Sequence, residues 1–235
     1  MSDNTGQNTL TEEEKEEGWR LLFDGESFDG WKALGRESIP NDLWEIQDGT
    51  IHKINTGEVE SLPDGRPAEG GDLMTEETFL DYELYFEWRV EPSGNTGLKY
   101  NVSEEISLEH GVSALGFEYQ LGDDRSFTEE NKASHRVGAV YDLFPTKDRI
   151  EINPTEEFNQ SRLIVDGNHV EHWLNGDKIL EYELGSKELD SAYRVSKFNV
   201  IPDFHKKRKA HLVLQNHKDA AWFRNIKIRE INTEE

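Results

Sequence analysis

Alternation of apolar and polar residues is clearest in DYELYFEWRVE, residues 81–91. Every second residue of this stretch is bulky and apolar: Tyr82, Leu84, Phe86, Trp88 and Val90. The residues between them are mostly charged. Successive side chains of a strand point to opposite faces, so the stretch predicts a long strand with one buried face.

Three Asx-Gly pairs separate further alternating runs, at Asp48-Gly49, Asp166-Gly167 and Asn175-Gly176. Such pairs accept the positive φ angles of type I′ turns and are the strongest short-range sign of a hairpin. They join predicted strands at residues 43–47, 50–54, 162–165, 169–174 and 178–184. Other strands are predicted at residues 98–102, 117–121, 137–141, 211–215 and 225–231. Since no long segment has a helical period, the sequence predicts an all-β fold, a two-sheet β-sandwich or jelly roll.

Length and composition further limit the possible domain organisation and function. The 235 residues suit one large all-β domain, which we predict at residues 18–232. Residues 1–17 are predicted to be an acidic tail, flexible or forming a short helix capped by Thr11. The net charge of −23 argues against electrostatic binding to nucleic acid or to an anionic membrane. The chain has no cysteine, which excludes disulfides and thiolate metal sites.

Three predicted strands carry polar residues on the face away from the core. These residues are Glu87, Arg89, Lys99, Asn101, Glu118 and Gln120. If the strands are neighbours, the groups form one patch that suits sugar hydroxyls, and its carboxylates could act as general acid or base. The alternative, which the pattern alone favours, is an exposed sheet face with cross-strand ion pairs. The Pro92–Gly97 segment is either a tight hairpin loop with glycines at positive φ or a loop that presents Asn95 to the patch.

The histidines show no metal-binding spacing. His169 and His172 would point to opposite faces of a strand, so His172 is predicted to be a hydrogen-bonded core residue rather than a zinc ligand. His217 is interpreted as a surface residue, and Asp123-Asp124 as a plain turn rather than a Ca²⁺ site. The sequence contains no nucleophile elbow, phosphate-binding loop or dinucleotide-binding motif.

Short segments follow one another in a characteristic order along the chain. They are LLFDG (21–25), FDGW (28–31), WEI (44–46), EWR (87–89), GNTGLKY (94–100), FEYQ (117–120), YDL (141–143), HVEHWLNG (169–176), SKF (196–198) and FRNIKIRE (223–230). Their number and order resemble the 3-keto-disaccharide hydrolase domain family over nearly the whole chain, from about residue 18 to residue 231. Three features depart from the family pattern: Phe158 in place of Trp, Asn216 in place of Asp, and Pro202–Lys209 in place of a Phe-Gly turn.

The resemblance implies a concanavalin A-like, two-sheet jelly roll and action on glycosides whose sugar C3 is oxidised to a ketone. It also implies export to the periplasm, or a lipid anchor, after removal of a leader. The expected partner is therefore an oxidised glucoside or disaccharide, with no nucleic acid and no membrane span. The oligomeric state stays open.

A ketone at C3 acidifies the C2 proton, and the C1 oxygen can then leave by elimination before water adds back. For this family chemistry we expect Glu118 to be the base that removes the C2 proton. Either Lys99 or Arg89 would stabilise the enolate, and Glu87 would assist the leaving oxygen or anchor sugar hydroxyls. Three further residues are expected to orient the sugar: Asn95, Gln120 and Lys197. No cofactor is specified, although Ca²⁺ or another divalent cation could replace the lysine.

Two other functions stay open at this point. A non-catalytic carbohydrate-binding module can share the same architecture, because fold does not determine function. A conventional glycoside hydrolase would instead use two carboxylates across a cleft, separated by roughly 5–10 Å.

Overall fold

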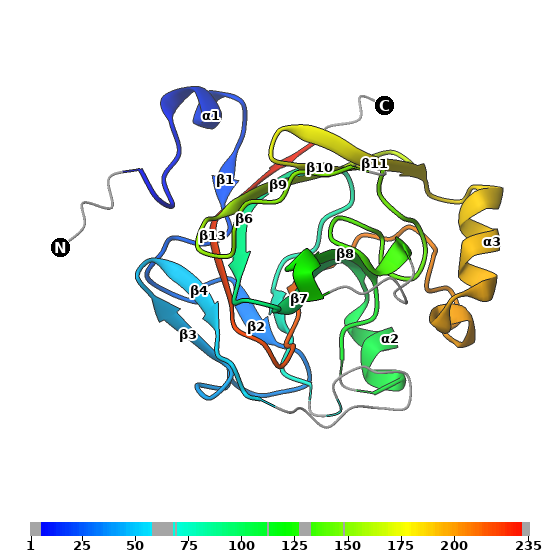
Figure 1. Cartoon of the computed structure of the whole chain (residues 1–235), viewed down its shortest axis with the longest axis horizontal. Coiled ribbons are helices and arrows are strands. Elements are labelled where there is room, and N and C mark those ends of the chain that lie inside the picture. Colours follow the sequence, from blue (N-terminus) through cyan, green and yellow to red (C-terminus); the bar gives the residue numbers. More distant parts are fainter. Residues whose placement is uncertain are drawn as a thin grey trace.

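The computed structural model describes residues 6–57, 68, 70–111, 113–126, 133–147 and 149–231. Its strands form two antiparallel sheets that pack face to face (Figure 1). The predicted concanavalin A-like two-sheet β-sandwich is confirmed. The longer loops that the sequence predicts at residues 55–72 and 128–136 lie partly outside the described residues.

The larger sheet consists of β1 (Arg20–Leu21), β3 (Trp44–Gln47), β4 (Thr50–Lys53), β6 (Tyr82–Val90), β9 (Asn159–Asp166), β10 (His169–Leu174), β11 (Asp177–Glu183) and β13 (Ala221–Glu230). Its order is β11-β10-β9-β6-β13-β4-β3, and β1 pairs with β13. The smaller sheet consists of β2 (Trp31–Ala33), β5 (Leu73–Thr75), β7 (Asn95–Val102), β8 (Phe117–Gly122) and β12 (His211–Leu214). Its order is β2-β5-β12-β7-β8.

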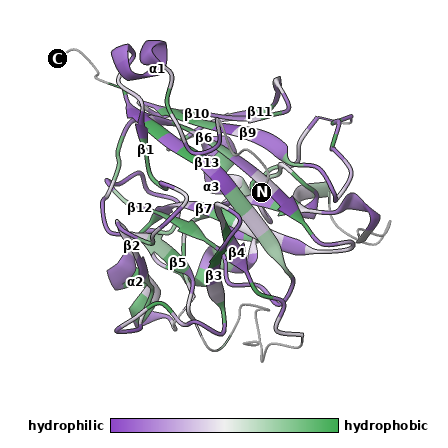
Figure 2. Cartoon of the chain, turned by 90° about the vertical axis from the view of Figure 1, so that its left-hand side faces the viewer, coloured by the Kyte–Doolittle hydropathy of each residue, from purple (hydrophilic) through white to green (hydrophobic). Residues whose placement is uncertain are grey.

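Three short α-helices lie outside the sheets: α1 (Glu12–Glu16), α2 (Glu104–Glu109) and α3 (Lys187–Val195). A hydroxyl side chain precedes each helix and accepts a hydrogen bond from a backbone N–H of its first turn. These hydroxyls belong to Thr11, Ser103 and Ser186 respectively. Figure 2 shows hydrophilic colour on α1 and hydrophobic colour along strands of the sheets. Among the described residues, no helix is long and apolar enough to cross a membrane.

The core lies between the two sheets. Leu84, Phe86 and Trp88 of β6 are at most 1% exposed, as the alternation predicts. Phe86 meets Tyr119 of the opposite sheet edge to face, with ring centroids 5.9 Å apart. The Trp88 indole N–H donates to Ser161 Oγ at 2.9 Å, so its one polar atom is satisfied in the core. Each such side chain contributes roughly 1.5–3 kcal/mol by burial.

The Pro92–Gly97 segment does not form the hairpin that was one of its two interpretations. It carries the chain from the larger sheet to the smaller one, and its last three residues already belong to β7. Positive φ is found at Ser93 (63°) and not at Gly94 or Gly97. A Cβ atom at position 94 would lie 2.8 Å from the Glu91 carbonyl oxygen, so close backbone approach explains that glycine.

The predicted strand at residues 137–141 is wrong. Positive φ at Gly138 (81°) and Asp142 (59°) bends this segment, and only isolated bridges form at Val140. The segment still bonds to β8, through the Tyr141 N–H to the Glu118 carbonyl at 2.9 Å. It therefore covers the edge of β8 and brings Tyr141 beside the polar face of the smaller sheet.

Candidate functional site

A polar hollow opens on the face of the smaller sheet that points away from the core. Its volume is about 50 Å³. Five of the seven predicted site residues line it: Asn95, Lys99, Glu118, Gln120 and Lys197. They reach this face because they alternate with core residues along β7 and β8 or lie in the segment after α3.

The register of the smaller sheet brings these groups together. Lys99 is paired with Glu118, and Gly97 with Gln120, across β7 and β8. On the other side of β7, the Gln215 N–H donates to the Gly97 carbonyl at 2.9 Å. Gly97 thus lies at the centre of the polar face and contributes no side chain to fill it.

The Glu118 carboxylate leans over Gly97. A Cβ atom at position 97 would lie 2.6 Å from Glu118 Oε1. Although Glu118 is only 7% exposed, its carboxylate has no hydrogen bond or ion pair within the part of the chain that the structure describes. A carboxylate held in place by packing alone keeps its lone pairs available for a substrate proton.

Lys99 approaches the same space from β7 and is 3% exposed. Its Nζ donates to the Ala114 carbonyl at 3.0 Å and lies 3.8 Å from Asp72 Oδ2. Asp72 in turn accepts the N–H groups of Ala114 at 2.6 Å and Asn216 at 2.7 Å. The ammonium is therefore fixed by a buried network at the edge of the hollow, where it can face a developing negative charge.

Amide groups line the other end of the hollow. Gln120 Nε2 donates to Asn95 Oδ1, and Gln120 Oε1 is buried without a partner among the described residues. Gln215 Oε1 is unpartnered in the same way. Buried polar atoms are nearly always hydrogen-bonded, so two orphan acceptors in one hollow point to hydroxyl donors of a ligand.

Tyr141 and Lys197 form one side of the hollow. Lys197 Nζ lies 4.6 Å from the centre of the Tyr141 ring, in a cation–π contact. Burial raises the pKa of the Tyr141 hydroxyl to about 12, and the charges of Glu118 and Asp142 act in the same direction. Tyr141 is therefore a neutral hydroxyl at physiological pH.

Glu87 and Arg89 do not belong to this site, which corrects their predicted place in the patch. Both lie on β6, in the opposite sheet from Lys99 and Glu118. Glu87 accepts from Arg224 Nε at 2.7 Å and from the Tyr85 hydroxyl at 3.0 Å.

The Arg89 guanidinium lies over the Trp222 ring, 3.9 Å from its centre. These contacts match the alternative interpretation of a sheet face held by cross-strand pairs. Alternation identifies which residues share a face, but it does not identify the sheet to which each strand belongs.

The prediction that His172 is a hydrogen-bonded core residue is confirmed. His172 is 0% exposed, with Nε2 2.8 Å from the Tyr100 hydroxyl and Nδ1 2.9 Å from the Gly138 carbonyl oxygen. Burial lowers its pKa to about 4. Asp123 accepts from the Ser93 N–H and from Arg125, so its carboxylate serves the turn.

One group of metal-ligand type occurs among the described residues, on the β10–β11 hairpin. It consists of His169, Glu171 and Glu181. The Lys178 ammonium already contacts both carboxylates, and the hairpin belongs to the larger sheet. A divalent cation beside Lys99 stays a prediction.

Sequence reasoning missed Tyr141, Gln215 and Asp72, and it placed His217 on the surface although this side chain also lines the hollow. Tyr141 belongs to a segment of the family resemblance, which was an available signal. Gln215 lies two residues after Val213, which pairs with Lys99, so alternation along the strand places Gln215 on the same face as Lys99. No local pattern marks Asp72, because its partners lie 42 and 144 residues away in the chain.

A two-sheet β-sandwich with an acid, an amine and several amides gathered above one bare glycine defines a carbohydrate-acting domain. The chain belongs to the 3-keto-α-glucoside-1,2-lyase-like domain family, whose sequence pattern matches residues 18–229. It is similar to a 3-keto-disaccharide hydrolase of Bacteroides thetaiotaomicron, with 28% identity over 92% of this chain and 79% of that protein.

Two solved structures from Parabacteroides distasonis, both proposed glycosyl hydrolases, share the fold. The first has a TM-score of 0.80 and 28% identity, and it covers 96% of this chain and 100% of that one. The second has a TM-score of 0.66 and 18% identity, with coverage of 91% and 99%.

Proposed function

We propose that this protein cleaves the glycosidic bond of 3-keto-glycosides, 3-keto-disaccharides among them, by removal of the C2 proton, β-elimination and hydration. The family and the Bacteroides relative support the substrate class. The observation that supports the chemistry is the position of the Glu118 carboxylate, which leans over Gly97 and has no partner among the described residues. Lys99 is the residue paired with Glu118 across β7 and β8.

In the first step Glu118 takes the C2 proton, and the electron pair moves toward the C3 oxygen as an enolate. Lys99 supplies the positive charge that stabilises this oxygen. The enolate then re-forms the ketone, the C1–O bond breaks, and the leaving oxygen takes up a proton from solvent. Water finally adds to C1 while C2 recovers a proton from Glu118, which returns the carboxylate to its starting state.

The small size of the hollow determines how a sugar would bind. Its volume of about 50 Å³ is far below the roughly 300–1,000 Å³ of typical small-molecule pockets. The ring therefore lies across the mouth of the hollow, and only its reacting edge enters. Gln120, Gln215 and Asn95 receive the sugar hydroxyls, which pairs the two orphan amide oxygens.

A conventional two-carboxylate hydrolase fits less well. Within the part of the chain that the structure describes, Glu118 is the one carboxylate in the lining of the hollow. A plain sugar-binding module is also disfavoured, because the aromatic ring of Tyr141 lies under the Lys197 ammonium and offers no open stacking platform.

The test is the Glu118→Gln variant assayed on a nitrophenyl 3-keto-glucoside. Loss of the base is expected to lower kcat by roughly 10²- to 10⁴-fold. The fold is expected to survive, because the carboxylate supports no described ion pair. Near-native turnover by this variant would remove Glu118 from the mechanism. The predicted export of the protein stays a prediction.

A further inference from the structure

His217 occupies the end of the hollow opposite Glu118. It follows β12, and its Nε2 lies 3.4 Å from the Asn95 side-chain amide nitrogen. Asn95 and Lys99, the register partner of Glu118, are four residues apart on β7, which is about 13 Å along the strand. The Glu118 carboxylate leans inward over Gly97, so a sugar ring above Gly97 would have a carboxylate on one side and an imidazole on the other.

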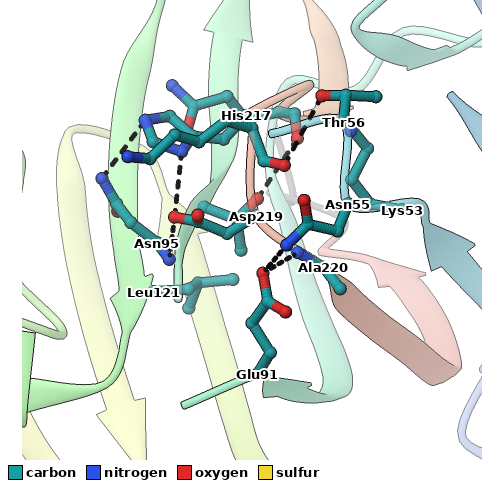
Figure 3. A network of polar contacts seen from close by, with 12 residues as sticks. Lys53, Asn55, Thr56, Glu91, Asn95, Leu121, His217, Asp219 and Ala220 are labelled. Carbon is teal, nitrogen blue, oxygen red and sulfur yellow. Dashed lines mark hydrogen bonds and ion pairs between the residues drawn. The ribbon is translucent and has the colours of Figure 1, made fainter. Parts of the chain in front are cut away.

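Hydrogen bonds determine which imidazole nitrogen accepts a proton. Gln120 Nε2 donates to Asn95 Oδ1, so the amide nitrogen of Asn95 is turned toward His217. That nitrogen can only donate, which makes His217 Nε2 an acceptor. The ring proton then lies on Nδ1, which is 3.4 Å from Asp219 Oδ2, a charge contact without hydrogen-bond geometry (Figure 3).

The surroundings of Asp219 favour its ionised form. It also accepts the Asn95 backbone N–H, at 3.0 Å. Burial alone would raise the pKa of Asp219, but the nearby His217 ring, the Asn95 N–H and the charge of Lys218 bring that pKa below its usual range.

A buried lysine, Lys53 of β4, is drawn in the same view beside Asn55 and Thr56 (Figure 3). Lys53 is 0% exposed and donates to the Ile54 carbonyl oxygen at 2.5 Å. Burial lowers the pKa of Lys53 to about 8, against the opposing charges of Asp219, Asp42 and Glu91. A buried ammonium is costly, and the negative charge of Asp219 offsets part of that cost for Lys53.

We propose that His217, held by Asp219, is the general base that activates the water for the hydration half of the reaction. This inference rests on the proposed function. After elimination, the water oxygen bonds to C1 of the unsaturated ketone, and its proton passes to His217 Nε2, whose long 3.4 Å contact with the Asn95 amide gives way to the water. C2 takes its proton from Glu118, and the imidazolium, stabilised by the Asp219 carboxylate, returns its proton to solvent. Glu118 therefore acts in both halves of the reaction, and His217 acts in hydration alone.

The experiment separates the two halves with one substrate. A nitrophenyl 3-keto-glucoside reports elimination through the released nitrophenol, and chromatography distinguishes 3-keto-glucose from the unsaturated 2-hydroxy-3-keto sugar. In the His217→Gln and Asp219→Asn variants, the ratio of 3-keto-glucose formed to nitrophenol released is expected to fall at least tenfold below the wild-type ratio. They are expected to form 3-keto-glucose at least tenfold more slowly and to accumulate the unsaturated sugar. His169→Gln, on the β10–β11 hairpin, is the matched control and should behave as wild type.

Three outcomes would overturn the proposal. One is His217→Gln forming 3-keto-glucose as fast as wild type. Another is a folded His217→Gln protein that no longer releases nitrophenol, because His217 would then act in elimination. The third is accumulation of the unsaturated sugar by wild type, since no hydration half would exist. If His217→Gln fails to fold, His217→Asn and Asp219→Asn are judged by the same criteria. A wild-type protein that releases no nitrophenol would instead overturn the proposed function.

Discussion

The missing side chain of Gly97 makes room for the carboxylate of Glu118. A Cβ atom at position 97 would lie 2.6 Å from Glu118 Oε1 and 2.8 Å from its carboxyl carbon. Gly97 has no positive φ, so its backbone conformation is open to any residue. The glycine is therefore required by the neighbouring carboxylate and not by the local backbone.

The Gly97→Ala variant tests this relationship. The new methyl group would displace the Glu118 carboxylate, which is the flexible end of a side chain, so the melting temperature should change by only a few degrees. The value of kcat for the 3-keto-glucoside should fall at least tenfold, because the base leaves its position.

Gly116→Ala provides the contrast. A Cβ atom there would lie 2.4 Å from the Tyr100 carbonyl oxygen, a backbone atom, so this variant should lose stability clearly. Full activity in Gly97→Ala would contradict the role that we assign to the glycine.

Replacement of Glu87 should affect stability and not turnover. Glu87→Gln removes charge from the hydrogen bonds with Arg224 and Tyr85 on the far sheet, at a cost of roughly 1–3 kcal/mol in the free energy of unfolding. Denaturant unfolding should show this loss, and kcat should stay within about twofold of wild type. A large loss of kcat with an intact fold would return Glu87 to the site.

The Tyr141 hydroxyl offers a test of sugar contact. Tyr141→Phe keeps the ring beneath Lys197 and removes a hydroxyl that has no hydrogen bond among the described residues, so stability should be unchanged. If the hydroxyl binds the sugar, kcat/KM should fall roughly 2- to 10-fold, which corresponds to one neutral hydrogen bond. An unchanged kcat/KM would show that the sugar does not reach this side of the hollow.

His172 predicts a specific loss of stability in acid. Its pKa is about 4 in the folded protein against an ordinary value of 6.5, so the unfolded chain binds the extra proton between these pH values. The contribution of neutral His172 to the free energy of unfolding is complete above pH 6.5. It is lost as the pH falls toward 4, by about 3 kcal/mol in total. Urea unfolding at pH 7 and pH 5 should show this slope in wild type and a shallower one in His172→Gln. Equal slopes would contradict the assignment.

The sequence predicts local structure well and long-range neighbours poorly. Asp48-Gly49 and Asn175-Gly176 form their hairpins with positive φ at all four residues, because the signal lies in the turn itself. The alternation of residues 82–90 likewise predicts which face of β6 packs in the core, although Glu83 and Glu87 on the other face are also buried.

Which strands become neighbours depends on packing between distant segments. Glu87 and Lys99 lie 12 residues apart in the chain and still belong to opposite sheets. The sequence could predict two pairs of the site, Lys99 with Glu118 and Gly97 with Gln120, because apolar and polar residues alternate regularly along their strands. The Asp72 network that fixes Lys99 was not, since no local pattern encodes it.

The fate of the C2 hydrogen shows whether the enzyme removes it as a proton. A 3-keto-glucoside carrying deuterium at C2 is cleaved in ordinary water, and the released 3-keto-glucose is analysed by mass spectrometry at early times, with enzyme-free product as the control for spontaneous exchange. Proton removal by Glu118 predicts that the deuterated substrate is cleaved more slowly than the unlabelled one, and that label is lost to the extent that Glu118 exchanges its proton with solvent before it returns to C2. Complete retention of the deuterium in the product, at the same rate as for the unlabelled substrate, would contradict the account.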